Sequence, residues 1–117
     1  MAVIDARSHE FLSKIQLPTG SLPMGTAISS DGKELYVSTG RGNTVAIIDT
    51  AKNAVATTIP VGNRAWGIAL DPSGSKLYTA NGASNDVSVV DLKSRKELHR
   101  IKVGDGPWGI AVVTAVK

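Results

Sequence analysis

The residues best suited to bind a ligand are two tryptophans, Trp66 and Trp108, which lie 42 positions apart. An indole ring offers a large apolar face and one N–H donor, so it either fills a packed interface or stacks against a ligand. The equivalent position in the preceding copy holds Met24, so an aromatic ring is not required in every copy. We expect the two rings to pack between neighbouring structural units; the alternative is that they line the mouth of a central channel.

Other residue types that carry chemistry are isolated from one another. Asp49 and Asp91 each end an apolar run, where a carboxylate most often accepts hydrogen bonds from the amides of a turn. Neither His9 nor His99 has a second ligand at the spacing of a metal site, and the sequence contains no cysteine. No serine has a glycine-flanked elbow and a histidine partner, and no phosphate-binding glycine loop is present. The sequence therefore predicts no catalytic residue, no cofactor and no metal, and we expect the protein not to be an enzyme.

Composition sets the class of the protein. Of its 117 residues, 42% are hydrophobic and 20% are charged, which favours a folded domain over a disordered chain. The net charge is +3, but the basic side chains are dispersed, so binding of nucleic acid is not expected. No apolar run approaches the roughly 18–20 residues that span a bilayer, and the first residues, MAVIDARSHE, do not have the pattern of a signal peptide.

The tryptophans belong to a repeat that runs through the sequence with a period of 42 residues. Gly25, Gly67 and Gly109 share one position of it, and the two tyrosines are related by the same offset. Each period contains four short apolar runs separated by turn sequences such as Asp71-Pro72-Ser73-Gly74. No window carries a helical apolar stripe, and glycines interrupt every candidate, so the runs are predicted to be strands.

Four short antiparallel strands in a period of this length are typical of one blade of a β-propeller. In chain order we call them the inner, second, third and outer strands of the blade. The expected fold class is therefore all-β, with four-stranded antiparallel meanders and about 2.75 blades in this chain. We expect a half blade at 1–20, complete blades at 21–62 and 63–104, and a lone inner strand within 105–117, at Trp108–Val113. Because a closed propeller needs about 4–8 blades, we also expect either self-association or a second chain that completes the ring.

The segments WGIALDPSGSKLYTANGASNDVSVVD and GDGPWGIAV resemble the YVTN-type repeats of bacterial and archaeal surface or periplasmic propellers. The name of that family comes from a second-strand Tyr-Val-Thr-Asn, and the corresponding segments here are Tyr36-Val37-Ser38-Thr39 and Tyr78-Thr79-Ala80-Asn81. The resemblance covers essentially the whole chain and implies a periplasmic or cell-surface location. It implies a fold but no single activity, since propellers host many unrelated functions.

A binding site on this fold is expected at the loops of one face of the disc. The outer-to-inner and second-to-third connections emerge together there, and they are richer in amides and aromatics than the lysine-rich turns opposite. The candidate ligand-binding residues on this face are Arg41, Asn43, Asn63, Arg64, Trp66, Asn85, Asp105 and Trp108. We expect a non-catalytic module that binds a protein, a glycan or a small ligand, or that serves as a scaffold. The alternative is a piece of a periplasmic redox propeller that resembles those of amine dehydrogenases or haem nitrite reductases.

Overall fold

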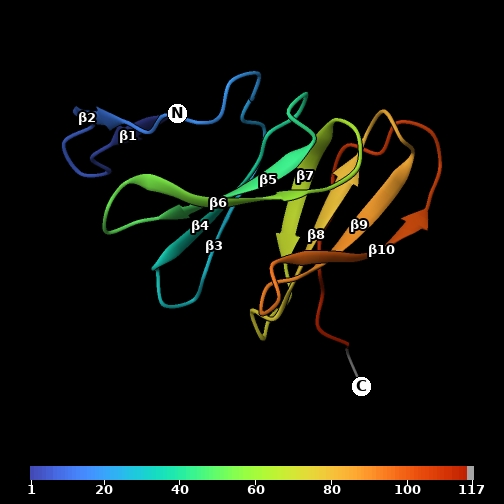
Figure 1. Ribbon diagram of the computed structural model, residues 1–117. Coiled ribbons are helices and arrows are strands. Elements are labelled where there is room, and N and C mark those ends of the chain that lie inside the picture. Colours follow the sequence, from blue (N-terminus) through green and yellow to red (C-terminus); the bar gives the residue numbers. More distant parts are fainter. Residues whose placement is uncertain (116–117) are drawn as a thin grey trace.

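The structure is a computed structural model that describes residues 1–115. Within these residues ten strands form three antiparallel sheets, and no helix is present (Figure 1). The two four-stranded sheets are meanders in which every strand pairs with its neighbours in the sequence. The all-β fold and the four-stranded units predicted from the repeat are therefore confirmed.

The first complete sheet, blade 1, consists of β3 (Thr26–Ile28), β4 (Glu34–Ser38), β5 (Thr44–Asp49) and β6 (Ala54–Pro60). Gly32 in the turn after β3 has a φ of 73°, a left-handed angle that glycine adopts without strain. At the end of β5, Asp49 Oδ1 accepts the N–H groups of Ala51 and Lys52. The prediction that this aspartate caps a turn is confirmed.

The second complete sheet, blade 2, consists of β7 (Ala65–Leu70), β8 (Lys76–Asn81), β9 (Asp86–Asp91) and β10 (Lys96–Lys102). It repeats the turn chemistry of blade 1, with Gly74 in the left-handed region at a φ of 74°. Asp91 Oδ2 accepts the N–H of Ser94 at 3.0 Å, which confirms the predicted role of this second aspartate. The same local residues therefore produce the same strand order twice.

A two-stranded hairpin of β1 (Ala2–Ile4) and β2 (Phe11–Lys14) precedes blade 1. Asp5, directly after β1, caps the following turn as Asp49 does at the end of β5, because its Oδ1 accepts the N–H groups of Arg7 and Ser8. We interpret the hairpin as the third and outer strands of an incomplete blade. Its apolar residues Ile15 and Leu17, which follow β2, are buried against blade 1.

The hydrophobic core lies between successive units. Two layers of buried apolar side chains separate three units, and burial of this kind is the main favourable term in folding. Between blades 1 and 2 the layer includes Tyr36, Val45, Ile47, Ile59, Val61, Ala65, Leu77, Val90 and Leu92. Between the hairpin and blade 1 it includes Ile15, Leu17, Val37, Ala46 and Ile48.

The prediction of a lone inner strand at Trp108–Val113 was wrong, because the described residues after β10 carry no strand. The segment still runs beside β7, where the carbonyl group of Trp108 lies close to Gly67. A strand needs a hydrogen-bonded neighbour, and within residues 1–115 no strand pairs with this segment. Residues 116 and 117, which the predicted unit included, lie outside the described residues.

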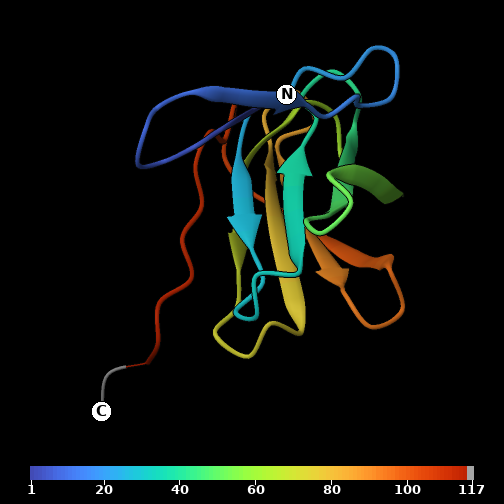
Figure 2. The same cartoon turned by 90° about the vertical axis from the view of Figure 1, so that its left-hand side faces the viewer.

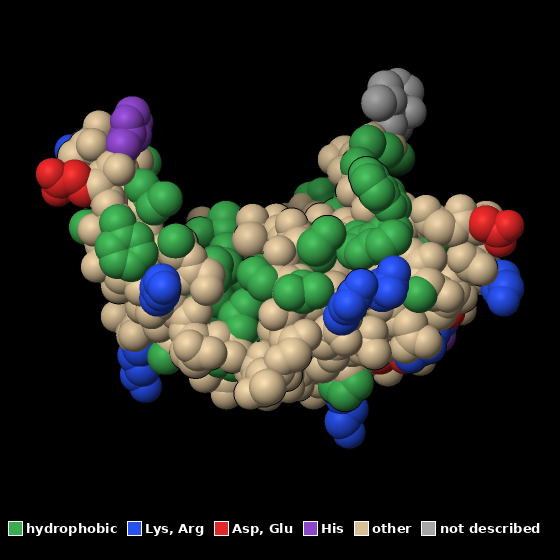
Figure 3. All heavy atoms as spheres, turned by 90° about the horizontal axis from the view of Figure 1, so that it is seen from above, with side chains coloured by type: hydrophobic (Ala, Val, Ile, Leu, Met, Phe, Trp, Pro, Cys, Tyr) green, Lys and Arg blue, Asp and Glu red, His purple; other side chains and the backbone are tan. Residues whose placement is uncertain are grey.

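The units form an arc. Figure 2 shows the turn of the hairpin and the segment that follows β10 projecting to the same side of the molecule. Seen from above, the outline is a crescent that is concave on that side (Figure 3). The inner strands β3 and β7 contact each other, so the concave side corresponds to the central axis of a propeller.

Candidate functional site

The candidate site lies where equivalent residues of three successive repeats converge: Met24, Trp66 and Trp108. A glycine follows each of them, and two of these glycines allow close approach of the next repeat. A β carbon on Gly25 would lie 2.9 Å from the carbonyl oxygen of Trp66, and one on Gly67 would lie 2.6 Å from that of Trp108. Only glycine tolerates such an approach, so the repeated glycine brings the three side chains together.

The two indole rings contact each other edge to face. Their centroids are 5.5 Å apart and their planes are inclined at 82°, which is a favoured geometry for aromatic pairs. Together with Met24 they line a pocket of about 220 Å³. Trp66 is half-buried, whereas Trp108 is 75% exposed. The pocket is therefore apolar, open to solvent and bordered by an accessible indole ring.

Trp66 also has a structural role. Its six-membered ring lies against the backbone of Gly82, where any β carbon would collide with it. Met24 lies over Gly40 in the same way, with its Cγ 3.0 Å from the position of a β carbon. Trp66 thus packs on its own blade and against Trp108, and does not fill the interface between two complete blades. Of the two tryptophans, Trp108 is the more available to a ligand.

Asn43 and Asn85 lie on the predicted face, but their side chains bind neighbouring loops. Both have left-handed backbone angles, with φ of 55° and 58°, which asparagine tolerates better than most residues. Asn43 Oδ1 accepts the N–H of Arg64 at 2.9 Å, and Asn85 Oδ1 accepts the N–H of Gly106 at 2.9 Å. Each bond joins a second-to-third loop to the outer-to-inner connection of its blade. The two kinds of loop that were expected to share a face are therefore in contact.

The remaining candidates, Arg41, Asn63, Arg64 and Asp105, are exposed on these loops. The backbone of Asn63 is anchored through its N–H to Ser84 Oγ at 3.0 Å. Two arginines against one aspartate give this set of side chains a positive balance. A role for them in ligand binding stays a prediction.

The histidines do not contribute to this site. His9 lies in the turn between β1 and β2, and His99 lies on β10 of blade 2. Within residues 1–115, no three histidine, aspartate or glutamate side chains lie close enough together to hold a metal ion.

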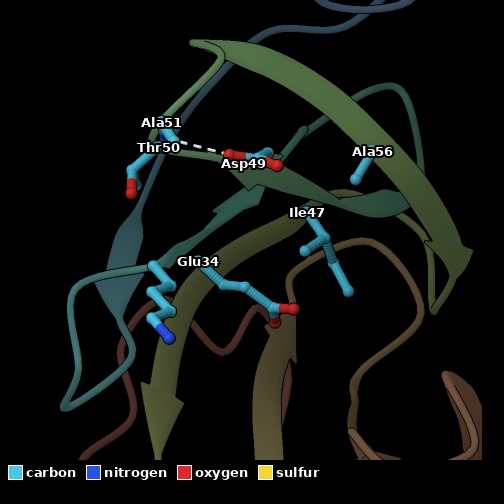
Figure 4. A pocket seen from close by; sticks show the side chains of 7 residues that line it. Glu34, Ile47, Asp49, Thr50, Ala51 and Ala56 are labelled. Atoms are coloured by element: carbon cyan, nitrogen blue, oxygen red, sulfur yellow. Dashed lines mark hydrogen bonds between the residues drawn. The ribbon is translucent and has the colours of Figure 1, made fainter.

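Two larger pockets lie elsewhere, beside the junction of blades 1 and 2. One of about 330 Å³ is lined by Lys33, Glu34, Ile47, Asp49, Thr50, Ala51 and Ala56 (Figure 4). The other, of about 390 Å³, surrounds the pair formed by Glu34 and Arg95. The acidic groups that line them, Asp31, Glu34 and Asp49, are already engaged in hydrogen bonds of the fold. We therefore regard both as crevices between structural elements.

An ion pair that sequence reasoning missed spans this junction. Arg95 Nη1 donates to Glu34 Oε2 at 2.9 Å, Arg95 Nη2 donates to Oε1, and the hydroxyl of Tyr36 donates to Oε2 at 2.9 Å. The guanidinium of Arg95 holds the pKa of the Glu34 carboxyl below its ordinary value. Burial, and then the hydrogen bond to Glu34, raise the pKa of Tyr36 to about 12. Glu34 and Arg95 are 61 positions apart, so no local pattern predicts their contact.

A buried polar network in blade 2 was also missed. Asn81 Nδ2 donates to Ser88 Oγ at 2.9 Å, and Ser88 Oγ in turn donates to Glu97 Oε2. The N–H of Gly62, from the connection between the blades, donates to Ser88 Oγ at 3.1 Å. Within the described residues every buried polar side-chain atom has a hydrogen-bond partner, so the network contributes to stability.

No family model matches the chain, and no curated protein matches it. Hydrazine synthase of Kuenenia stuttgartiensis is 32% identical, with a TM-score of 0.75 over 88% of this chain and 30% of that chain. Apo AztD of Citrobacter koseri is 23% identical, with a TM-score of 0.72 over 94% of this chain and 32% of that chain. A functionally unknown protein of Desulfotomaculum acetoxidans is 19% identical, with a TM-score of 0.74 over 92% and 36%.

Hydrazine synthase and AztD are β-propeller-like. The chain has the fold of a β-propeller segment. It spans about a third of the length of the solved structures that it matches. In the part of the chain that the structure describes, no helix is long and apolar enough to cross a membrane.

Proposed function

We propose that this segment is a non-catalytic module that binds a carbohydrate ring at its concave side, against Trp108. The observation that carries the proposal is the indole of Trp108, which is held against Trp66 yet is 75% exposed. Covering such a ring removes a large apolar area from water. A sugar ring presents an apolar face to an indole and hydroxyl groups to polar side chains, and Asn63, Arg64 and Arg41 are exposed on the loops of this face.

Titration with a panel of mono- and oligosaccharides, followed by tryptophan fluorescence and calorimetry, tests this proposal. We expect one member of the panel to bind and Trp108→Ala to weaken its binding at least about tenfold, or about 1.4 kcal/mol. Lys93→Ala, on a turn of the opposite face, is the matched control and leaves the affinity unchanged. A Trp108→Ala protein that binds as tightly as the parent, or a panel without any binder, contradicts the proposal.

The second candidate is a segment of a redox enzyme. It is favoured by the 32% identity to hydrazine synthase, although the chain covers only 30% of that protein. A visible absorption spectrum of protein purified from its source cells discriminates between the two candidates. A chromophore that stays with the protein through gel filtration supports the redox candidate and contradicts a non-catalytic module.

We further propose that the repeats are of the YVTN type and that the protein works in the periplasm or at the cell surface. The second-strand segments that begin at Tyr36 and Tyr78 support this assignment. Fractionation of the source cells, with an antibody raised against residues 1–115, checks the location. Recovery of the protein in the cytoplasmic fraction alone contradicts it.

A further inference from the structure

Exposed large hydrophobic side chains lie at both ends of the arc, on the hairpin and on or after β10, and three more, Leu22, Met24 and Ile28, lie along the segment that contains β3. Within residues 1–115, one group lies in the first 28 residues and the other follows residue 97. The groups are Ile4, Phe11, Leu12, Leu22, Met24 and Ile28, and Leu98, Ile101, Trp108 and Val113. Figure 3 shows hydrophobic side chains along the concave side and towards both ends of the crescent. Apolar patches of this kind commonly mark protein interfaces.

Repeat equivalence explains why these residues are exposed. Ile59 of blade 1 faces blade 2 and is 0% exposed, whereas its equivalent in blade 2, Ile101, is 47% exposed. In the other direction, Ile48 of blade 1 faces the hairpin and is 0% exposed, whereas its equivalent in the hairpin, Ile4, is 58% exposed. The open face of blade 2 is therefore equivalent to the face that blade 1 packs on blade 2, and the outward face of the hairpin is equivalent to the face that blade 1 packs on the hairpin. Together the two open faces correspond to the two sides of one blade junction.

The inner-strand glycines show the same pattern. The carbonyl of Trp108 lies against Gly67, but no non-adjacent heavy atom lies within 4 Å of the β-carbon position of Gly109. The residue that would lie against Gly109 is the one equivalent to Trp108 in a following unit. Met24 is the first residue at that position of the repeat, so Met24 of a second copy would lie against Gly109 if that copy followed.

We propose that the two ends bind each other head to tail, so that the open face of blade 2 in one copy packs on the outward face of the hairpin in a second copy. Ile101 and Val87 of the first copy would then face Ile4 and Phe11 of the second. The composite blade at this contact would consist of the segment after β10 of the first copy and the hairpin of the second, and it would lack a second strand. The hairpin already packs on blade 1 with only two strands, so a complete blade is not required for such packing. Exposed apolar faces and unpaired strand edges both favour such association. This inference does not rest on the proposed sugar site.

Head-to-tail contacts close into a ring when the rotation per copy divides a full turn. Each copy supplies two complete blades and one composite position that it shares with its neighbour. Two copies therefore give six blade positions, within the range of about 4–8 that propellers use, whereas three give nine. We expect a closed dimer of about 24 kDa, twice the mass of the chain.

Multi-angle light scattering and sedimentation equilibrium on the 117-residue protein measure the assembly. We expect the parent to be a dimer, and Ile101→Asp or Ile4→Asp each to raise the apparent dissociation constant at least tenfold. Thr57→Asp, at an exposed position on β6 of the middle unit, is the control that leaves the dimer intact. Circular dichroism and the urea midpoint verify folding, and Phe11→Asp replaces Ile4→Asp if the latter unfolds.

Mixing the two interface variants separates a head-to-tail contact from a symmetric one. The Ile101→Asp variant keeps an unchanged hairpin, and the Ile4→Asp variant keeps an unchanged open face of blade 2. These two surfaces still fit each other, so the mixture is expected to form heterodimers although neither variant associates strongly alone. Isologous dimers would use one patch on both copies, and mixing would not restore them.

A folded parent that stays at 12.2 kDa through the micromolar range overturns the proposal. A dimer that mixing fails to restore overturns it as well, because its interface is then symmetric. Neither substitution changes Trp108, so the sugar titration can be repeated on the same variants.

Discussion

The two junctions of the arc are built on equivalent backbones but with different chemistry. Under the hairpin, blade 1 presents Val37 and Ala46, which belong to an apolar layer. At the equivalent positions under blade 1, blade 2 presents Thr79 and Ser88, which are also buried. The first junction is therefore held by non-directional apolar contact, and the second combines apolar contact with hydrogen bonds.

The polar groups of blade 2 bind the backbone of the connection that leads out of blade 1. Ser88 Oγ accepts the N–H of Gly62, and Arg100 Nη2 donates to the carbonyl of Val61 at 3.3 Å. Glu97 binds both Ser88 and Arg100, so one carboxylate connects the two contacts. Hydrogen bonds are directional, and they define the position of one complete blade against another more narrowly than apolar packing does. At the junction between the hairpin and blade 1, the equivalent side chains of Val37 and Ala46 carry no donor or acceptor for such bonds.

The largest expected effect is at the apolar junction. Ile48→Ala leaves a cavity beneath the hairpin, because Ile48 is fully buried and a partly open layer of two strands cannot collapse onto it completely. Such truncations cost about 2–5 kcal/mol. Urea denaturation followed by circular dichroism measures the loss. Thr57→Ala, at an exposed position on β6, is the control and should change the stability by less than about 0.5 kcal/mol.

A smaller but more specific effect is expected at the polar junction. Ser88→Ala removes the acceptor of the Gly62 N–H and the partner of Glu97 and Asn81, and an unsatisfied buried group costs about 1–3 kcal/mol. Chemical denaturation measures this loss too. The reciprocal change Ala46→Ser places a hydroxyl in the apolar layer under the hairpin and should also destabilise. If either exchange leaves the urea midpoint unchanged, the two junctions do not differ in the way described.

The fold was predictable because its determinants are local and repeated. The 42-residue period and the turn residues define strand order, and the roles of Asp49 and Asp91 follow from their position at the ends of strands. The absence of a strand at Trp108–Val113 could not be predicted from the residues of that segment alone. Its pattern matches that of an inner strand, but a strand forms only where a neighbour supplies hydrogen bonds.

The candidate site was predicted only in part. The repeat located Trp66 and Trp108, and the structure brings them into contact. Asn43 and Asn85 were chosen as ligand-binding amides, but their oxygens bind loop amides 21 positions away. A comparison of equivalent positions, such as Ser88 with Ala46, contains the signal for the buried network, because a polar residue replaces an apolar one at a position that both blades bury.

The smallest expected effect comes from the ion pair across the blade junction, between Glu34 and Arg95. Their side chains are about one-third exposed, so the pair should stabilise the fold by no more than about 1 kcal/mol. The pKa of Glu34 is lowered in the folded state, so its contribution is present above the ordinary value of 4.5 and is lost as the pH falls through the lowered pKa. Glu34→Gln should therefore be less stable than the parent at pH 7, and the difference should shrink as the pH falls below 4.5 and through the lowered pKa of Glu34. Urea midpoints of both proteins across this range measure the difference, and Arg95→Gln combined with Glu34→Gln in a double-mutant cycle isolates the pair. A gap between parent and Glu34→Gln that stays constant with pH would assign the effect to lost packing, and the junction would then be held by its apolar layer and its buried network alone.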